Sequence, residues 1–150
     1  MLSDTTVIGT EQSPNLSFRP YEHSRLNAGY YLPLSKRATL LLQAQAGLNR
    51  HYQQAIANDF VVGGLVSGLR NQLTFAGLPE AGLYTGSAVV GLVGYQYAVA
   101  PKIFVIAKAN ALYHDFVANA AWPQPARIIY GGSLTLGINS LLGPIDVSLM

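Results

Sequence analysis

Asn58-Asp-Phe-Val-Val-Gly-Gly-Leu-Val-Ser-Gly-Leu-Arg-Asn-Gln-Leu-Thr-Phe-Ala-Gly-Leu78 is the stretch that decides the fold, because long alternating segments flank it on both sides. Three of its four glycines, Gly63, Gly64 and Gly68, lie close together, and each weakens a helix by about 1 kcal/mol relative to Ala. In extended chain, clustered glycines mark a bulge, a bend or the close approach of another backbone segment. Arg70 is the one Lys or Arg in the stretch. We therefore expect an extended, bent segment with Arg70 inside a larger structure.

The composition is unusual for a soluble protein. Hydrophobic residues make up 50% of the 150-residue chain and charged residues only 11%, whereas about 25% charged residues is usual. No window contains the roughly 18 consecutive apolar residues that a transmembrane helix requires. A chain this apolar without a spanning helix is typical of a transmembrane β-barrel, in which every backbone group pairs between strands. The predicted fold class is therefore all-β, an antiparallel transmembrane β-barrel.

Charge and cysteine content narrow the possible partners. The net charge is +2 and the nine Lys and Arg residues form no run, so nucleic acid is not an expected partner. The absence of cysteine excludes disulfides and thiolate metal sites, and it is compatible with a periplasmic or outer-membrane location. No cofactor is expected. Residues 1–6 lack the basic and apolar regions of a signal peptide, so we expect a mature or internal fragment of an exported protein.

Alternation of apolar and polar residues predicts paired strands. Residues 25–34 and 38–49 each place aliphatic side chains on one parity, and in 38–49 the other parity carries Gln43, Gln45 and Asn49. Successive side chains of a strand point to opposite faces. Amide side chains suit a hydrated lumen, so the aliphatic parity is expected to contact lipid. Strands of about ten residues have the length that a tilted transmembrane strand needs.

The same pattern continues to the end of the chain. Strands are expected over 84–99, 102–113 and 127–139, and a last one begins at Ile145. The turns at 35–37 and 100–102 are short, whereas the loops at 50–58, 77–84 and 115–126 are longer, which is typical of outer-membrane barrels. Lys108 lies in mid-strand and would cost about 2–4 kcal/mol on a lipid face, so it should point inward. Weaker extended segments are expected at 5–10 and 16–19.

With this register, the chain resembles a known family over roughly residues 25–150. Phe60-Val-Val-Gly63-Gly64, then Leu69-Arg70, two long strands, and Tyr130-Gly-Gly-Ser-Leu-Thr-Leu-Gly to Gly143-Pro144-Ile145 are similar to the C-terminal half of bacterial surface-antigen barrels. This is the superfamily of outer-membrane assembly and two-partner secretion barrels of Gram-negative bacteria. The variant from Asn71 to Leu78 most resembles the barrels fused behind patatin-like phospholipase domains.

The resemblance implies a sixteen-stranded barrel, of which this chain supplies about eight strands as a single domain, 1–150. Where the family has Arg-Gly, this chain has Arg70-Asn71. This difference favours resemblance to the patatin-linked barrels over resemblance to the assembly factors. The aromatic residue on which the family's closing strand ends is missing. We therefore expect two open sheet edges that pair with the remainder of the barrel or with a second copy of the chain. Membrane lipids are the other expected partner.

Catalytic chemistry is not expected from this chain. The Gly-x-Ser-x-Gly elbow of a patatin-like lipid hydrolase is absent, and Ser87 lies at the start of a strand instead of at a strand-to-helix turn. The three histidines share no metal-ligand spacing, and His114-Asp115 is interpreted as a surface or rim pair. The residues singled out as lumenal or motif candidates, with no catalytic, cofactor or metal role, are Phe60, Gly63, Gly64, Arg70, Lys108 and Asn110. Among the residues of this stretch, Phe60 and Val62 are expected to contact lipid, and Arg70 is expected to lie in the lumen.

Three functional hypotheses remain open from the sequence. The first is a membrane-embedded barrel that anchors an enzyme, with a patatin-like phospholipase as the favoured parent. The second is the barrel of an outer-membrane assembly or two-partner secretion protein. The third is a soluble lipocalin-like barrel whose oily parity points inward around an apolar ligand. The polar parity holds Gln, Asn, Ser, Thr and Gly where a water-facing exterior should carry Lys and Glu, which favours the membrane hypotheses.

Overall fold

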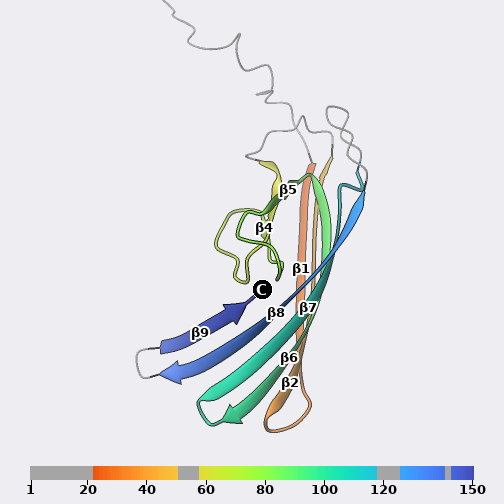
Figure 1. The fold of residues 1–150 in the computed structure, drawn as a ribbon. Helices are drawn as coiled ribbons and strands as arrows, with labels where there is room; N and C mark the ends of the chain where they lie inside the picture. The colour runs from red at the N-terminus through yellow and green to blue at the C-terminus, as the bar shows by residue number, and fades with distance from the viewer. Residues whose placement is uncertain (1–21, 51–57, 118–125, 141–142) are drawn as a thin grey trace, which may run out of the picture.

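A computed structural model describes residues 22–50, 58–117, 126–140 and 143–150. The described chain forms one large antiparallel sheet with strand order β1-β2-β6-β7-β8-β9, and the sheet is curved and open (Figure 1). No helix among these residues is long and apolar enough to cross a bilayer. The strands of the large sheet are β1 (Glu22–Pro33), β2 (Ala38–Arg50), β6 (Ser87–Ala100), β7 (Ile103–His114), β8 (Arg127–Ser140) and β9 (Gly143–Leu149).

The turns that join β1 to β2 and β6 to β7 lie at the same end of the large sheet (Figure 1). The turn between β1 and β2 is held by the Ser35 hydroxyl, which accepts hydrogen bonds from the backbone N–H groups of Arg37 at 3.2 Å and Ala38 at 3.1 Å. Only Pro101 and Lys102 separate β6 from β7. Both predicted short turns are thus present, whereas most of the predicted loops at 50–58 and 115–126 lies outside the described residues.

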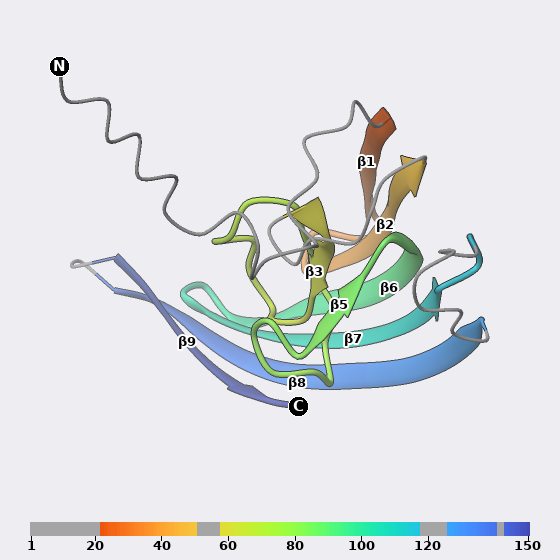
Figure 2. The same cartoon turned by 90° about the horizontal axis from the view of Figure 1, so that it is seen from above.

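A second, smaller sheet forms from the stretch between β2 and β6. Its strands are β3 (Phe60–Val62), β4 (Gln72–Leu73) and β5 (Leu83–Thr85), with β3 parallel to β4 and antiparallel to β5. Seen from above, this sheet lies in the hollow of the large sheet (Figure 2). We call residues 58–86 the plug segment.

The sequence predicted the long strands well and the Gly-rich stretch poorly. The boundaries of the six wall strands fall within about three residues of expectation. All six of the long strands predicted for the wall are present among the described residues. The weak segments predicted at 5–10 and 16–19 lie outside the described residues. The antiparallel, open barrel-like sheet confirms the predicted fold class.

Candidate functional site

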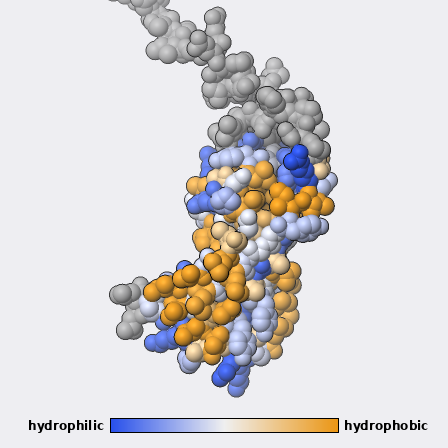
Figure 3. Space-filling view, viewed as in Figure 1, coloured by the Kyte–Doolittle hydropathy of each residue, from blue (hydrophilic) through white to orange (hydrophobic). Residues whose placement is uncertain are grey.

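The convex face of the large sheet is apolar between the strand ends. The register places Leu42, Val93, Ala109 and Gly132 side by side on this face. Its side chains are exposed, with Val93 at 51% and Leu134 at 52%. Polar side chains share this parity only at the strand ends, as Glu22, Ser24, Arg50, Ser87 and Ser140. Figure 3 shows hydrophobic residues gathered over the lower part of the molecule, where β8 and β9 lie.

This orientation contradicts the lipocalin-like hypothesis. In a soluble barrel the oily parity would be enclosed, whereas here the plug segment packs against the opposite parity, on Ala88, Val90 and Leu112. An exposed apolar surface extending over six strands is far larger than the apolar patches of ordinary soluble monomers. It is the surface expected of a barrel wall in contact with lipid.

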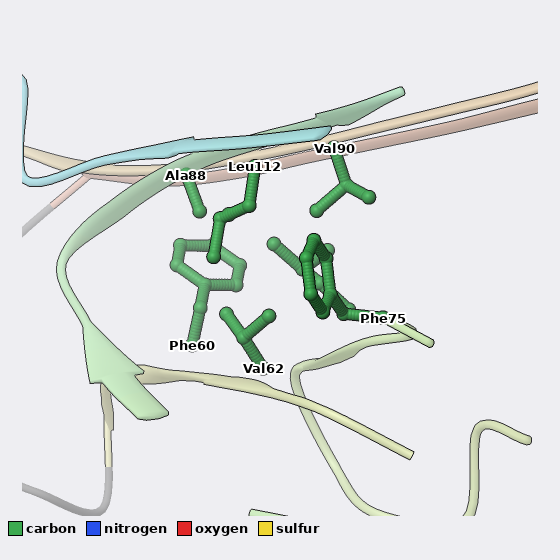
Figure 4. Packing of buried hydrophobic residues seen from close by; sticks show 7 residues of the cluster. Phe60, Val62, Phe75, Ala88, Val90 and Leu112 are labelled. Carbon is green, nitrogen blue, oxygen red and sulfur yellow. The ribbon is translucent and has the colours of Figure 1, made fainter. Parts of the chain in front are cut away.

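The plug segment packs on the concave face through a small hydrophobic core. Phe60, Val62, Leu73 and Phe75 are between 0% and 1% exposed, and they meet Ala88, Val90 and Leu112 of the wall. Figure 4 shows side chains of the two layers facing each other. Each large apolar side chain buried in this way contributes about 1.5–3 kcal/mol. The prediction that Phe60 and Val62 contact lipid is therefore wrong: they point to the concave face because β3 lies inside the hollow.

Two glycines in the wall make room for the aromatic rings of the plug. An added Cβ on Gly47 of β2 would lie 2.6 Å from the ring of Phe60. An added Cβ on Gly131 of β8 would overlap the carbonyl oxygen of Ala76 and lie 2.6 Å from the ring of Phe75. Sequence analysis missed both positions. Both are glycines within a strand, on the parity that faces inward. A glycine within a strand often marks the close approach of another segment, and this feature could have identified them.

Gln72 organises the plug segment from within. Its side chain is fully buried; Nε2 donates to Gly63 O at 2.8 Å, and Oε1 accepts from the N–H groups of Gly68 at 2.7 Å and Leu69 at 2.8 Å. These bonds close the loop between β3 and β4 around one amide. Backbone also approaches the glycine pair closely, since a Cβ on Gly63, whose φ is 134°, would collide with the carbonyl oxygen of Pro79.

Polar side chains on β1 and β2 fasten the plug segment to the wall. Arg25 Nη2 donates to Gln72 O at 2.8 Å. Gln45 Nε2 donates to Thr74 Oγ1 at 2.8 Å, and Gln45 Oε1 accepts from Thr74 N at 2.9 Å. The amides that the sequence assigned to a watery lumen thus hold an internal segment instead of facing only solvent.

His23 and Asn49 make a further attachment near the loop end of the sheet. His23 Nδ1 lies 2.6 Å from Asn49 Oδ1, and Asn49 Nδ2 donates to Asn58 O at 2.8 Å. The imidazole stacks on the Phe60 ring with centroids 4.8 Å apart. These contacts attach the plug segment to the wall beside Phe60, the ring for which Gly47 makes room.

Arg70 lies at the exposed tip of the plug segment. The tip, residues 65–70, includes Val66, which is 77% exposed, and Leu69, which is 44% exposed. Arg70 is followed by Asn71, whose φ of 58° lies in the left-handed region that glycine and asparagine adopt most readily. Asn71 can therefore take the backbone conformation that the family's glycine permits. Arg70 makes no ion pair within the described part of the chain.

Lys108 and Asn110 both lie on the inward parity of β7. Lys108 is opposite Ser133 of β8, and its stem packs near Gly94. Asn110 is 6% exposed and is opposite Gly131. The structure therefore brings these two residues together on the concave face, apart from Arg70 on the tip and from Gly63 and Gly64 in the plug.

His114 and Asp115 form an ordered pair where β7 ends. His114 Nδ1 lies 2.7 Å from Asp115 Oδ2, and Thr85 Oγ1 donates to Asp115 Oδ1 at 2.7 Å. His114 is at the rim as predicted, but it is 3% exposed, so the surface position is wrong. The Ser87 hydroxyl accepts from Val117 N at 3.0 Å, whereas His114 Nε2 has no hydrogen-bond partner among the described residues. A Ser-His-Asp relay is therefore not assembled here.

No group of three or more potential metal ligands occurs among the residues that the structure describes.

The concave face of the wall holds the plug segment, and the convex face is apolar. This is the arrangement of a membrane β-barrel with an internal plug. Comparison with protein-family models matches residues 2–150 to the OMP85 superfamily. The chain belongs to this superfamily and is an outer-membrane β-barrel domain. No curated protein and no solved structure matches the chain.

Proposed function

We propose that this barrel domain is the membrane anchor of a larger protein that carries a patatin-like phospholipase domain. The observation that carries the proposal is the run from Asn71 to Leu78, which follows Leu69-Arg70 and resembles the patatin-linked barrels of the superfamily. Within this run, Gln72 organises the plug segment through its buried side chain.

An anchoring role also agrees with the way the concave face is occupied. The plug segment combines a buried apolar cluster with hydrogen bonds from Arg25 and Gln45. A passage for polypeptide would require these contacts to be broken or bypassed. An anchor requires only that the convex face remain in lipid.

Lipid hydrolysis, in this proposal, takes place in another domain of the same protein. Nucleophilic catalysis needs a base within hydrogen-bond reach of the nucleophile. The base of such a relay is the His Nε2 atom, and His114 Nε2 makes no hydrogen bond to Ser87 or to any other described residue. The Ser87 hydroxyl accepts a hydrogen bond from Val117 N instead. We therefore assign no catalytic residue to this chain.

The second candidate function is transport of polypeptide, as in assembly or two-partner secretion barrels. The observation that favours it is the exposed tip of the plug segment, where Val66, Leu69 and Arg70 remain available for contact. A transporting barrel would use these residues when the plug changes position.

The experiment uses the natural full-length protein purified from outer membranes in detergent. A fluorophosphonate probe that labels activated serines is added, and the labelled peptide is located by mass spectrometry. We expect labelling outside residues 1–150, together with release of fatty acid from phospholipid vesicles. Absence of both, with conductance across a planar bilayer that responds to deletion of residues 65–70, would favour transport instead.

A further inference from the structure

Three cations lie at the end of the large sheet where the short turns are. Lys36 and Arg37 belong to the turn between β1 and β2, and Lys102 belongs to the turn between β6 and β7. We call these three residues the turn cations. All three are exposed, and none forms an ion pair within the described part of the chain. Figure 3 shows hydrophilic residues at this lower end of the molecule, below the apolar surface.

Backbone hydrogen bonds hold the two turns side by side. Ala98 N donates to Arg37 O at 2.7 Å, which ties the β1–β2 turn to the end of β6. Asn139 N donates to Lys102 O at 2.8 Å, which ties the β6–β7 turn to β8. The turn cations therefore lie on one continuous stretch of the wall, whichever rotamers their side chains adopt.

Acidic side chains are scarce at this end of the sheet. Among the described residues, Asp59 and Glu80 belong to the plug segment, and Glu22 and Asp115 lie at the opposite end of the wall. The remaining described acid, Asp146 of β9, is opposite Gly137 on the concave parity. The positive charge of the turn cations is therefore not balanced on the convex side, which favours a negatively charged partner there.

The position of the turn cations relative to the bilayer identifies that partner. Tyr97 and Tyr95 lie on the convex parity opposite Ala38 and Leu40, at the start of β2, and they are 41% and 43% exposed. In outer-membrane barrels, aromatic girdles lie at the membrane interface and the short turns lie on the periplasmic side. The turn cations follow directly after these tyrosines, at the level of the lipid headgroups of the periplasmic leaflet.

We propose that Lys36, Arg37 and Lys102 bind the phosphate groups of anionic phospholipids in the periplasmic leaflet. Lysine and arginine both donate charge-assisted hydrogen bonds to phosphate. The apolar convex face beside Tyr95 and Tyr97 contacts the acyl chains of the same lipids. The surface is independent of which domain accompanies the barrel, so failure of the proposed function would leave it standing.

The test measures the melting temperature of the natural full-length protein in nonionic detergent micelles. Phosphatidylglycerol, phosphatidylcholine and soluble glycerol phosphate are titrated in three parallel series. A ligand that binds only the folded state raises the melting temperature in a saturable way. We expect phosphatidylglycerol to act at a lower concentration than phosphatidylcholine. The difference should shrink as sodium chloride is added, because salt screens exposed charges.

Two double variants locate the effect on the wall. Lys36→Gln combined with Lys102→Gln should raise the phosphatidylglycerol concentration at half response by about tenfold or more, since each cation near an anionic surface contributes about fivefold. The matched control, Arg50→Gln combined with Arg127→Gln, removes two exposed cations from the opposite end of the wall and should respond as the wild type does. Both variants should fold normally, because substitutions of exposed residues rarely change stability much.

Three results would overturn the proposal. The first is equal stabilisation of the wild type by phosphatidylglycerol and phosphatidylcholine. The second is an equal response of the two double variants to phosphatidylglycerol. The third is a response to soluble glycerol phosphate as strong as that to phosphatidylglycerol, which would indicate a site for free phosphate instead of a lipid surface.

Discussion

Replacing Gly131 by alanine should loosen the plug segment. The added methyl group would overlap the carbonyl oxygen of Ala76 and lie 2.6 Å from the ring of Phe75. The obstructing oxygen belongs to the backbone, so no flexible side chain can move aside to relieve the overlap. The plug segment must therefore shift away from β8, which disturbs the packing around Phe75, now only 1% exposed.

The expected cost follows from two terms of similar size. Over-packing in a filled core costs about 1–3 kcal/mol, and partial exposure of an aromatic side chain forfeits some of the roughly 1.5–3 kcal/mol that its burial contributes. Replacing glycine by alanine in a strand would otherwise gain about 0.5–1 kcal/mol. We expect Gly131→Ala to lower the free energy of unfolding by about 1–3 kcal/mol.

Gly91→Ala in β6 is the matched control, because nothing lies within 4 Å of a Cβ added to Gly91. The assay follows the heat-modifiable gel shift of the full-length protein and cleavage within the tip by trypsin at Arg70. Gly131→Ala should lose the folded band at a lower temperature and be cleaved faster, whereas Gly91→Ala should match the wild type. Equal melting and equal cleavage of the two variants would refute docking of the plug on Gly131.

Three further changes test other contacts. Ala109→Arg on the convex face should destabilise the barrel by about 2–4 kcal/mol in lipid, as measured by denaturant titration in vesicles. The control, Asn27→Arg on the concave face, should cost under about 0.5 kcal/mol. Equal effects of the two substitutions would contradict the assigned faces. Gln72→Leu should cost about 1–3 kcal/mol, because the N–H groups that its side chain binds lose their acceptor; an unchanged melting temperature would count against its organising role. A double-mutant cycle with Gln45→Ala and Thr74→Val should give a coupling of about 0.5–3 kcal/mol for the bond from Gln45 Nε2 to Thr74 Oγ1. Additive effects would show that this side-chain bond contributes nothing.

The wall of the barrel was predictable because alternation has a direct physical cause. A wall strand meets lipid on one side and the lumen on the other, so its two parities must differ in polarity along the whole strand. Residues 38–49 illustrate this: aliphatic side chains alternate with Gln43, Gln45 and Asn49, and β2 has that register. Lys108 was assigned inward for the same reason, and it lies on the concave parity.

The plug segment was less predictable because its structure depends on contacts that are distant in sequence. Phe60 and Val62 alternate as they would in a wall strand, and nothing local shows that they face Leu112 instead of lipid. Phe60 contacts Gly47 of the preceding wall strand, β2. Phe75 contacts Gly131 of β8, and the two wall strands β6 and β7 lie between these residues in the sequence. Gln72 is one amide among many in the sequence, and only the folded loop shows that its side chain binds three backbone groups.

The central claim is that the large sheet is a membrane wall with a lipid-facing and a lumen-facing parity. The chain has no cysteine, so single cysteines can be introduced along β1 without background. The measurement is the rate of labelling by a membrane-impermeant maleimide in the full-length protein reconstituted in lipid. We predict fast labelling at Arg25→Cys and Asn27→Cys, on the concave parity, and slow labelling at Leu26→Cys and Ala28→Cys, on the convex parity. Uniform rates at the four positions, or the reverse alternation, would contradict the account.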